Sequence, residues 1–433
     1  MEADARPDGE GAALSDTIYA LSSGAPPAGV AIIRISGPRA ADALVALARR
    51  LPEPRVATFR QLRVDGELLD NSVILWLPGP KSATGEDVAE LHVHGGRAVI
   101  MRALAALGAM ARLREARPGE FTRRSFENGA LDLAEAEGLG DLLLAETEGQ
   151  RRAALALMGG KLSREVAAWQ ERLLALAAEV EAALDFSDED DVEPLAPDFG
   201  VRIAALRGEM ADVLARPGAE RLRDGVRVVI AGPPNAGKSS LLNGLAEREA
   251  AIVTDLPGTT RDLVEVPVAL GGIPFLLTDT AGLRETADVV ETIGVERARA
   301  SVQGADIVLW LGPPAEAPAG AVRIHAKADL ATAPADADLA TSVVTGEGLA
   351  ALVELLVARA RDLLPIPGEI ALNARHRAAI AEAAGALGDA GSPDLLIAAE
   401  VLRTARTALD RVTGKAGVED MLDALFGRFC IGK

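Results

Sequence analysis

One stretch, VRVVIAGPPNAGKSSLLNGL at residues 226–245, constrains the fold more than any other part of the sequence. A β-branched apolar run ends at Gly232, and apolar residues return at helical spacing from Leu241. Between them, residues 232–239 match G-x-x-x-x-G-K-[ST], the phosphate-binding loop, in the strand–turn–helix context that this motif requires. Backbone N–H groups of such a turn, and of the helix that follows it, bind an anionic phosphate chain. The stretch therefore predicts an α/β domain that binds a nucleoside triphosphate.

Three residues of the loop suit a phosphate chain in different ways. Gly237 lets the backbone approach the phosphates, Lys238 adds a point charge, and Ser239 offers a hydroxyl to Mg²⁺. A glycine-rich turn without a ligand is the alternative. The strand and the helix on either side make that alternative the weaker one.

Composition limits the class of protein. A length of 433 residues suggests two to four domains, and a hydrophobic content of 49% indicates packed globular domains. The net charge of −19 argues against an unspecific nucleic-acid coat but leaves a local basic patch open. A single cysteine, Cys430, excludes a disulfide framework. We find no signal peptide in the acidic N-terminal stretch and no apolar run long enough to span a bilayer, so we expect a cytoplasmic protein.

Changes in pattern divide the chain into five segments. Residues 1–15 are an acidic lead-in that we expect to be disordered, and mixed strands and helices over 16–130 predict a compact α/β unit, with strands at 30–35, 72–80 and 88–96. Helical periodicity covers 131–222, the nucleotide domain covers 223–366, and helices return over 367–433. In the first helical block one apolar stripe steps by three and four through Val166, Trp169, Leu173, Leu176, Val180 and Leu184. Neither helical block is long enough to close a bundle alone, so we expect the two blocks to pack together with the nucleotide domain inserted between them. The predicted fold class is multidomain, α/β plus all-α.

Two segments after the loop contain groups that a nucleotide hydrolase needs. IVTDLPGTTRD at 252–262 offers the hydroxyls of Thr259 and Thr260, which suit Mg²⁺ and the γ-phosphate in a mobile switch. The strand FLLTDTAG at 275–282 ends with Asp279, placed for the Mg²⁺ shell, and with Gly282, whose N–H can contact the γ-phosphate.

The residue that orients the attacking water differs from the usual pattern. Leu283 follows Gly282, where many GTPases have a glutamine, and leucine cannot polarise water. Glu291 is the best candidate for that role, and a surface glutamate at a helix start remains the alternative. An arginine finger is not evident in this sequence. A cation held by the side-chain oxygen of Asn235 could replace it.

The element that selects the base is incomplete. In VRIHAKADL, Ala326 stands where the asparagine of N-K-x-D is expected, while Lys327 can pack over the base and Asp329 can accept from guanine N1–H and the exocyclic amine. A lost hydrogen bond of this type costs about 1 kcal/mol, so we expect guanine preference to survive on Asp329. TSVVTGEGL at 341–349 occupies the position of the second base-contacting loop. The connection over 312–321 is short for a parallel crossover, so either a helix is missing or the sheet edge is irregular.

The N-terminal unit contains two polar features with open interpretations. His92 and His94 alternate with apolar residues on one strand face, which favours a structural or hydrogen-bonding role over a metal site, because a third ligand is not obvious nearby. The arginines of RLREARPGEFTRRSF at 112–126 form a basic cluster. This cluster is either a solvated face or a site for an anionic ligand or RNA.

Several stretches together carry a resemblance to a known family, and they run from about Asp16 to Lys433: GVAIIRISG, SATGEDVAELHVHGG, ARPGEFTRRSFENGALDLAEAE, GPPNAGKSSLLN, IVTDLPGTTRD, DTAGLRE and FCIGK. The chain resembles the MnmE (TrmE) family of bacterial tRNA-modification GTPases. The TGEDV-to-HGG block and the FCIGK stretch are specific to that family rather than to GTPases in general. The resemblance implies a folate-binding and dimerising N-terminal domain, a discontinuous helical domain and an inserted Ras-like GTPase domain.

The resemblance also implies ligands and partners. The N-terminal domain would bind 5,10-methylene- or 5-formyl-tetrahydrofolate through Arg34, Glu90 and Lys433, whereas Ala130 stands where the family usually has a lysine. The chain would form a homodimer and join the FAD protein MnmG in a heterotetramer. That complex would add a carboxymethylaminomethyl or aminomethyl group to C5 of wobble uridine, position 34, in certain tRNAs. Cys430 would lie near the folate.

Matching the family motifs to this sequence gives the residues implied for the GTPase site. Mg²⁺ would be held by Ser239 and Thr260, and Glu291 would position the water. K⁺ would be held by Asn235, Thr254, Leu256 and Thr259, and it would bring two GTPase domains together so that dimerisation activates hydrolysis. The nucleotide-contacting set is Asn235, Ala236, Gly237, Lys238, Ser239, Ser240, Thr254, Asp255, Leu256, Pro257, Gly258, Thr259, Thr260, Asp279, Thr280, Ala281, Gly282, Lys327 and Asp329.

Two other classes of function remain as alternatives. One is a regulatory or ribosome-assembly GTPase that switches without modification chemistry, and it needs neither the N-terminal blocks nor FCIGK. The other is a degenerate GTPase that serves as a scaffold, which Ala326 and the short crossover favour. The residues that argue against the scaffold are all intact: Lys238, Ser239, Thr260, Asp279 and Glu291.

Overall fold

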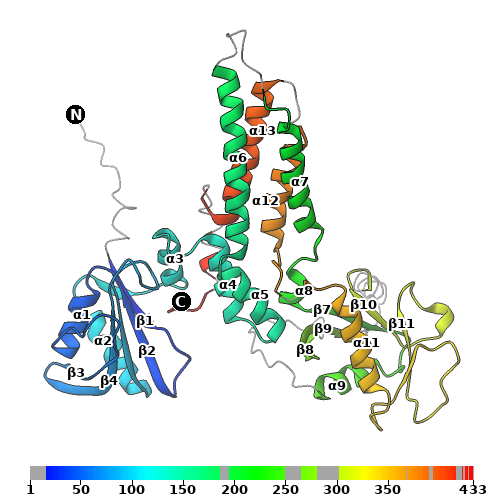
Figure 1. The fold of residues 1–433 in the computed structure, drawn as a ribbon. Helices are drawn as coiled ribbons and strands as arrows, with labels where there is room; N and C mark the ends of the chain where they lie inside the picture. The colour runs from blue at the N-terminus through cyan, green and yellow to red at the C-terminus, as the bar shows by residue number, and fades with distance from the viewer. Residues whose placement is uncertain are drawn as a thin grey trace, which may run out of the picture. The chain divides into compact units, whose positions relative to one another are not determined.

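The computed structural model describes residues 16–185, 195–248, 265–279, 302–366, 368–389, 394–415, 422, 425–427 and 429–432. The chain divides into two compact units. Unit 1 comprises the residues up to Glu137 together with those from Thr413 onward, and unit 2 spans Gly138–Val412. Each unit is described by itself (Figure 1).

Unit 1 is built on a sheet of six described strands in the order β3-β4-β5-β2-β1-β6. Neighbouring strands are antiparallel except for β1 and β6, which are parallel. The strands are β1 (Thr17–Leu21), β2 (Ala28–Ser36), β3 (Thr58–Val64), β4 (Glu67–Leu77), β5 (Val88–Gly95) and β6 (Leu113–Glu115). The structure confirms the strands predicted from Val30, Ser72 and Val88, whereas β3 was not predicted.

Helices α1 (Ala40–Ala48) and α2 (Arg97–Gly108) contribute to the core of this sheet. Because side chains alternate along a strand, Ile33, Ile35 and Leu91 are buried in this core with Leu44 and Leu107 from the helices. The intervening residues on β2 and β5, which include Arg34 and Glu90, lie on the opposite face. The sheet therefore presents one packed face, and a second face that is polar around Arg34 and Glu90 and is covered by Phe121 at Ile18 and Ala20 of β1.

The C-terminal residues of unit 1 pack beside α3 (Glu120–Glu127), close to α4 (Leu133–Leu143). Phe126 of α3 contacts the ring of Phe426, which in turn contacts Phe429. Ile431 forms an antiparallel bridge with Pro118, just before α3 begins. The tail is thus an integral part of the N-terminal α/β unit.

Gly119, the residue before α3, packs closely against the backbone of the tail. Its φ is +68°, and a Cβ there would lie 2.2 Å from the carbonyl oxygen of Phe426. We expect Gly119→Ala to lower the free energy of unfolding of unit 1 by about 2 kcal/mol or more, because it adds a clash to the backbone strain. Urea denaturation, with proteolysis of the tail as a second readout, measures the effect.

Gly129 supplies a matched control for Gly119. Its φ is +69°, yet a Cβ there would meet nothing within 4 Å. Gly129→Ala therefore carries only the left-handed strain, about 1 kcal/mol. Equal losses for the two variants would show that the contact with Phe426 contributes nothing.

Long helices from both sides of the nucleotide domain pack together in unit 2, as predicted (Figure 1). Gln170 donates to Asp410 at 2.7 Å, and Arg377 donates to the carbonyl of Leu214 at 2.6 Å. The stripe predicted on the longest helix is buried from Val166 through Val180, and its last residue, Leu184, is half-buried. These helices are α5 (Glu148–Met158), α6 (Lys161–Asp185), α7 (Phe199–Ala215), α12 (Ala374–Ala386) and α13 (Leu395–Thr413). The domain boundaries at 130, 222 and 366 remain predictions.

The nucleotide domain is built on a second sheet of six described strands, in the order β12-β11-β10-β7-β9-β8. All neighbours are parallel except β8 and β9. The strands are β7 (Val226–Ala231), β8 (Glu265–Leu270), β9 (Ile273–Asp279), β10 (Ile307–Trp310), β11 (Val322–Ala326) and β12 (Leu339–Thr341). Helices α8 (Glu220–Asp224), α9 (Lys238–Arg248) and α11 (Leu349–Arg361) complete the described elements.

The connection between β10 and β11 lacks the usual crossover helix. The two strands are parallel, with Leu309 opposite Val322, and every residue between them is described. The one regular element there is a 3₁₀ turn, η3 (Pro314–Glu316). Of the two possibilities raised by the short sequence, the missing helix is correct.

The described part of the chain contains no helix that is both long enough and apolar enough to cross a membrane.

Candidate functional site

The phosphate-binding loop lies between β7 and α9, as the sequence predicted. Gly237, just before α9, has φ +96°, and Asn235 has φ +60°, so the loop turns sharply before Lys238 begins the helix. Both conformations belong to the left-handed region that bulky residues avoid. The turn ends at a helix N-terminus, which favours an anion.

Lys238 and Ser239 make internal contacts that a bound nucleotide would replace. The side chain of Lys238 is buried, with 6% exposed, and Nζ donates to the carbonyls of Gly232 at 3.2 Å and Pro233 at 2.9 Å. The hydroxyl of Ser239 donates to the carboxylate of Asp279, at the end of β9. A hydroxyl and a carboxylate are hard oxygen donors, so this pair suits Mg²⁺. The structure thus brings together three predicted site residues, Lys238, Ser239 and Asp279, of which the first and last are 41 positions apart in the sequence.

The base-binding elements meet the same loop. Lys327 Nζ donates to the carbonyl of Asn235 at 2.8 Å, which ties the AKAD segment to the phosphate loop. Asp329 accepts from the hydroxyl of Ser342 at 2.6 Å. A pocket opens there, and its lining residues are Gly237, Ser240, Leu241, Ala326, Lys327, Asp329, Leu330, Thr341, Val343 and Val344. Ser342 was not named by sequence reasoning, although the loop around it was.

A second polar cluster lies on the open face of the unit 1 sheet. Arg34 and Glu90 are opposite each other on β2 and β5, and Arg34 Nε donates to Glu90 Oε1 at 3.0 Å. His92 Nε2 lies 3.1 Å from the other oxygen of Glu90. The guanidinium of Arg34 lies 5.8 Å from the ring centre of Phe121. The two predicted folate contacts are therefore adjacent, with His92 as a third member.

The two histidines each contact a carboxylate, which supports the hydrogen-bonding interpretation. His94 Nδ1 lies 2.8 Å from Asp70 Oδ1, and the His94 N–H donates to Asp70 Oδ2 at 2.8 Å. Burial alone would raise the pKa of Asp70, but the hydrogen bonds from His94, Asn71 and Ser72 lower it. Among the described residues, His, Cys, Asp and Glu side chains form no group of three that could hold a metal ion.

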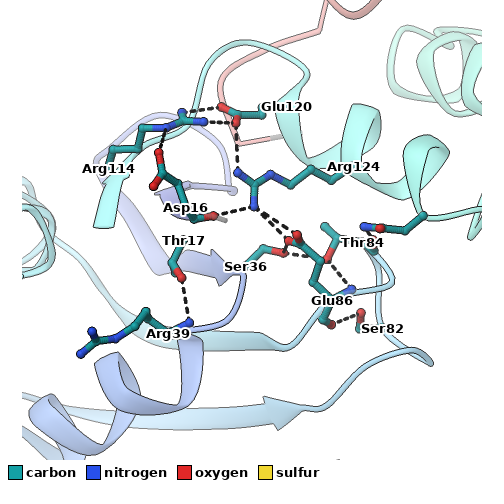
Figure 2. Close-up of polar contacts among 11 residues, drawn as sticks. Asp16, Thr17, Ser36, Arg39, Ser82, Thr84, Glu86, Arg114, Glu120 and Arg124 are labelled. Carbon is teal, nitrogen blue, oxygen red and sulfur yellow. Dashed lines mark hydrogen bonds and ion pairs between the residues drawn. The ribbon is translucent and has the colours of Figure 1, made fainter. Parts of the chain in front are cut away.

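Two arginines of the predicted basic cluster, Arg114 and Arg124, join an ion-pair network around Glu120 (Figure 2). Arg112 and Arg117 are exposed, as the solvated-face interpretation predicts. Arg124 is 2% exposed, and its guanidinium donates to Glu86 at 3.1 Å, to Glu120 at 3.3 Å and to the carbonyl of Asp16 at 2.8 Å. Arg114 donates to Glu120 at 2.9 Å. Arg124 is thus neither on a solvated face nor on an open anion site, and both sequence interpretations are wrong for it. Its carboxylate partners lie on different elements.

Two family models match this chain. The model described as "GTP-binding protein TrmE N-terminus" matches residues 17–130, and the one described as "MnmE helical domain" matches residues 133–430.

The chain belongs to the MnmE family.

Relatives in this family match along nearly the whole chain. The tRNA modification GTPase MnmE of Erythrobacter litoralis is 59% identical over 96% of this chain and 100% of its own length. The protein of the same name from Rhizorhabdus wittichii is 60% identical over 98% of each chain. Among solved structures, the G domain of the T. maritima FeoB iron transporter is 27% identical over 31% of this chain and 98% of that chain, with a TM-score of 0.24. At that TM-score the match says nothing about the arrangement of the whole chain.

For this MnmE-family chain, the predicted site residues divide into two groups. Asn235, Ala236, Gly237, Lys238, Ser239, Ser240, Asp279, Lys327 and Asp329 all lie around the β7–α9 loop and the segment after β11, and Arg34 and Glu90 lie in unit 1. The other group lies outside the described residues: Thr254, Asp255, Leu256, Pro257, Gly258, Thr259, Thr260, Thr280, Ala281, Gly282, Glu291 and Lys433.

Proposed function

We propose that this chain is a K⁺-dependent GTPase that works in adding a carboxymethylaminomethyl or aminomethyl group to C5 of wobble uridine in certain tRNAs. The observation that carries the proposal is the pairing of a complete phosphate loop with relatives, each named a tRNA modification GTPase, that match over almost the whole chain.

Nucleoside analysis of tRNA from cells that lack the chain tests this function. We expect the modified wobble uridines to disappear and to return when the gene is restored. A Lys238→Met gene should fail to restore them, since it removes the phosphate-binding charge. Unchanged wobble uridines would instead favour the switch or ribosome-assembly GTPase.

The described residues support the binding part of GTP hydrolysis. Lys238 and the N–H groups of the loop bind the phosphates, and Ser239 with Asp279 would hold Mg²⁺, which neutralises charge on the phosphate chain. Thr260 would complete the Mg²⁺ shell, and Gly282 would contact the γ-phosphate. Asp329 would select guanine, and Lys327 would pack over the base.

We assign the positioning of the attacking water to Glu291. Its replacement by alanine removes a carboxylate that can accept a proton from the water, so GTP turnover should fall by roughly 100-fold while nucleotide affinity is kept. Single-turnover hydrolysis and GDP titration separate the two quantities. Full GTPase activity in Glu291→Ala would instead support the alternative, a surface glutamate without a catalytic role.

Potassium should complete the site through Asn235, Thr254, Leu256 and Thr259. Asn235 is the described member of this set, and its left-handed φ of +60° lies within the phosphate loop. A cation beside the phosphates supplies the charge that an arginine finger provides elsewhere, so GTP turnover should be roughly tenfold faster or more in KCl than in NaCl at equal ionic strength. Equal rates in the two salts would exclude this mechanism.

The cluster on the open face of unit 1 supports a folate site for a one-carbon donor, 5,10-methylene- or 5-formyl-tetrahydrofolate. Glu90 is an acceptor for pterin N–H groups, and Arg34 fixes its carboxylate. Lys433 would lie close to the folate. At position 130 this chain has alanine, where the family usually has a lysine. Equilibrium dialysis with 5-formyl-tetrahydrofolate should show weaker binding for Glu90→Gln than for the wild type. Unchanged binding would refute the placement of the folate at Glu90.

The same sheet face supports a homodimer. Val30 lies opposite His94 on the neighbouring strand. Phe59 lies opposite Val73, which lies opposite His92 on the next strand, so both apolar residues share the face of the histidines. Val30 is 56% exposed and Phe59 is 64% exposed. Apolar side chains exposed on a sheet face mark an interaction surface. We place this face in a homodimer that joins the FAD protein MnmG and tRNA in the cytoplasm. Light scattering should give the mass of two chains, and a measured mass of one chain would refute the dimer.

A further inference from the structure

We infer that the base pocket holds guanine by its N1 and N2 edge and leaves N7 without a hydrogen-bond partner. The inference rests on the proposed GTP site, and it adds a class of substrate. Guanine nucleotides that lack the N7 acceptor should bind this chain as well as GDP and GTP do.

The reading of the N1 and N2 edge depends on how Asp329 is held. Ser342 is fully buried, and its hydroxyl donates to Asp329 Oδ1 at 2.6 Å while accepting from the N–H of Thr345 at 3.2 Å. A hydroxyl held from both sides has a fixed direction, so it fixes the carboxylate as well. An ionised carboxylate only accepts hydrogen bonds, which matches the two donors on guanine N1 and N2.

Guanine N7 is a hydrogen-bond acceptor, so a contact to it needs a donor from the protein. The described side chains that line the pocket offer few hydrogen-bond donors. The side chains of Ala326, Val343 and Val344 carry no polar atom. In the proposed site Lys327 packs over the face of the base, and its Nζ is held at 2.8 Å from the carbonyl of Asn235, away from the edge that carries N7. Thr341 is 1% exposed.

Position 326 is where the donor is missing. A Cβ on Gly237 would lie 3.6 Å from Ala326 Cβ, so residue 326 faces the loop that leads into α9. An asparagine there would present an amide to this side of the pocket, whereas alanine presents a methyl group. Ser240, on the first turn of α9, is the remaining hydroxyl at the rim of the pocket.

Competition binding on the full chain tests the inference, with a fluorescent GDP displaced by GDP or by 7-deaza-GDP. The 7-deaza compound has C–H in place of N7 and keeps the N1 and N2 edge. We expect the two affinities to agree within roughly twofold, because no protein hydrogen bond is lost. A preference of fivefold or more for GDP would overturn the inference.

Two variants sharpen the result. Ala326→Asn should create a preference for GDP over 7-deaza-GDP of roughly fivefold, the effect of one added hydrogen bond. Ser240→Ala should weaken the two ligands equally or not at all, and a selective loss of GDP binding would overturn the inference by making Ser240 the N7 donor. The wild-type comparison stands by itself if Ala326→Asn does not fold.

Asp329→Asn separates this inference from the proposed function. It should weaken GDP and 7-deaza-GDP by the same factor and improve binding of xanthosine diphosphate, because the amide can donate to the extra carbonyl of xanthine. Unchanged GDP binding would overturn the placement of the base in this pocket. That outcome is distinct from unchanged tRNA nucleosides, which would refute the modification function alone.

Discussion

Replacing Arg124 with methionine should lower the free energy of unfolding of unit 1 by about 3–5 kcal/mol. The guanidinium is buried between Glu86, Glu120 and the carbonyl of Asp16, and methionine fills much of the stem volume without the charge. Two largely buried carboxylates would then lack their shared cation, and the cost of leaving a buried charge unpaired is large. Hydrogen–deuterium exchange of peptides from β1 and β2 resolves the effect on unit 1.

Arg123, one residue earlier, is the control for Arg124. It forms an i,i+4 pair with Glu127 at 2.8 Å, and its side chain is 40% exposed. Arg123→Met removes the same charge from the same helix but should cost less than about 0.5 kcal/mol. Similar losses for the two variants would mean that burial of Arg124 is irrelevant to stability.

Acid provides a second readout of the same network. Burial alone would raise the pKa of Glu120, but Arg114, the N–H of Arg117 and Arg124 lower it below 4.5. A carboxyl whose pKa is lower in the folded chain stabilises the fold above pH 4.5, and that contribution is lost as the pH falls through the folded value. Arg124→Met removes one cause of the lowered pKa, so its stability should depend less steeply on pH below 4.5 than that of the wild type.

Lys238→Met should weaken GTP binding by about 4 kcal/mol, which is roughly a thousandfold. The ammonium is already held over the loop by two carbonyls, so little ordering is needed when phosphates arrive. Methionine keeps the apolar stem that α9 buries and removes only the charge. Isothermal titration with GTP and Mg²⁺ measures the loss.

Lys161→Met is the matched control for Lys238→Met. Lys161 also begins a helix, and its Nζ donates to the carbonyl of Gly368 at 2.6 Å. The variant has the same change in net charge outside the phosphate loop, so GTP affinity should not change. A loss of less than tenfold for Lys238→Met would contradict the assigned role of the lysine.

The parts of the structure that follow from local pattern were predictable. The strand, loop and helix over 226–245 were found because periodicity and the glycine spacing agree, and the buried stripe of α6 was found because its apolar residues repeat at three and four. The missing crossover helix was predictable as one of two possibilities, since a connection of ten or so residues is short for a helix and two turns.

Features that depend on distant partners were not predictable. The sequence contains Arg123 and Arg124 side by side, and their burial differs because Glu86 comes from a turn 38 positions earlier. Ser342 belongs to no motif by itself, and its role appears only when Asp329 lies beside it. Strand β3 was missed because its side chains are mostly half-exposed, which weakens the apolar alternation.

Unit 1 is built from two segments of the chain that are translated at different times, one before unit 2 and one after it. The tail that packs on Gly119 and Pro118 is joined to the sheet in space but is separated from it in sequence by all of unit 2. Because a ribosome releases residues in order, the sheet emerges long before its covering segment. Unit 1 can therefore complete its packing only after unit 2 has been translated, and until then Phe126 of α3 lacks its contact with Phe426.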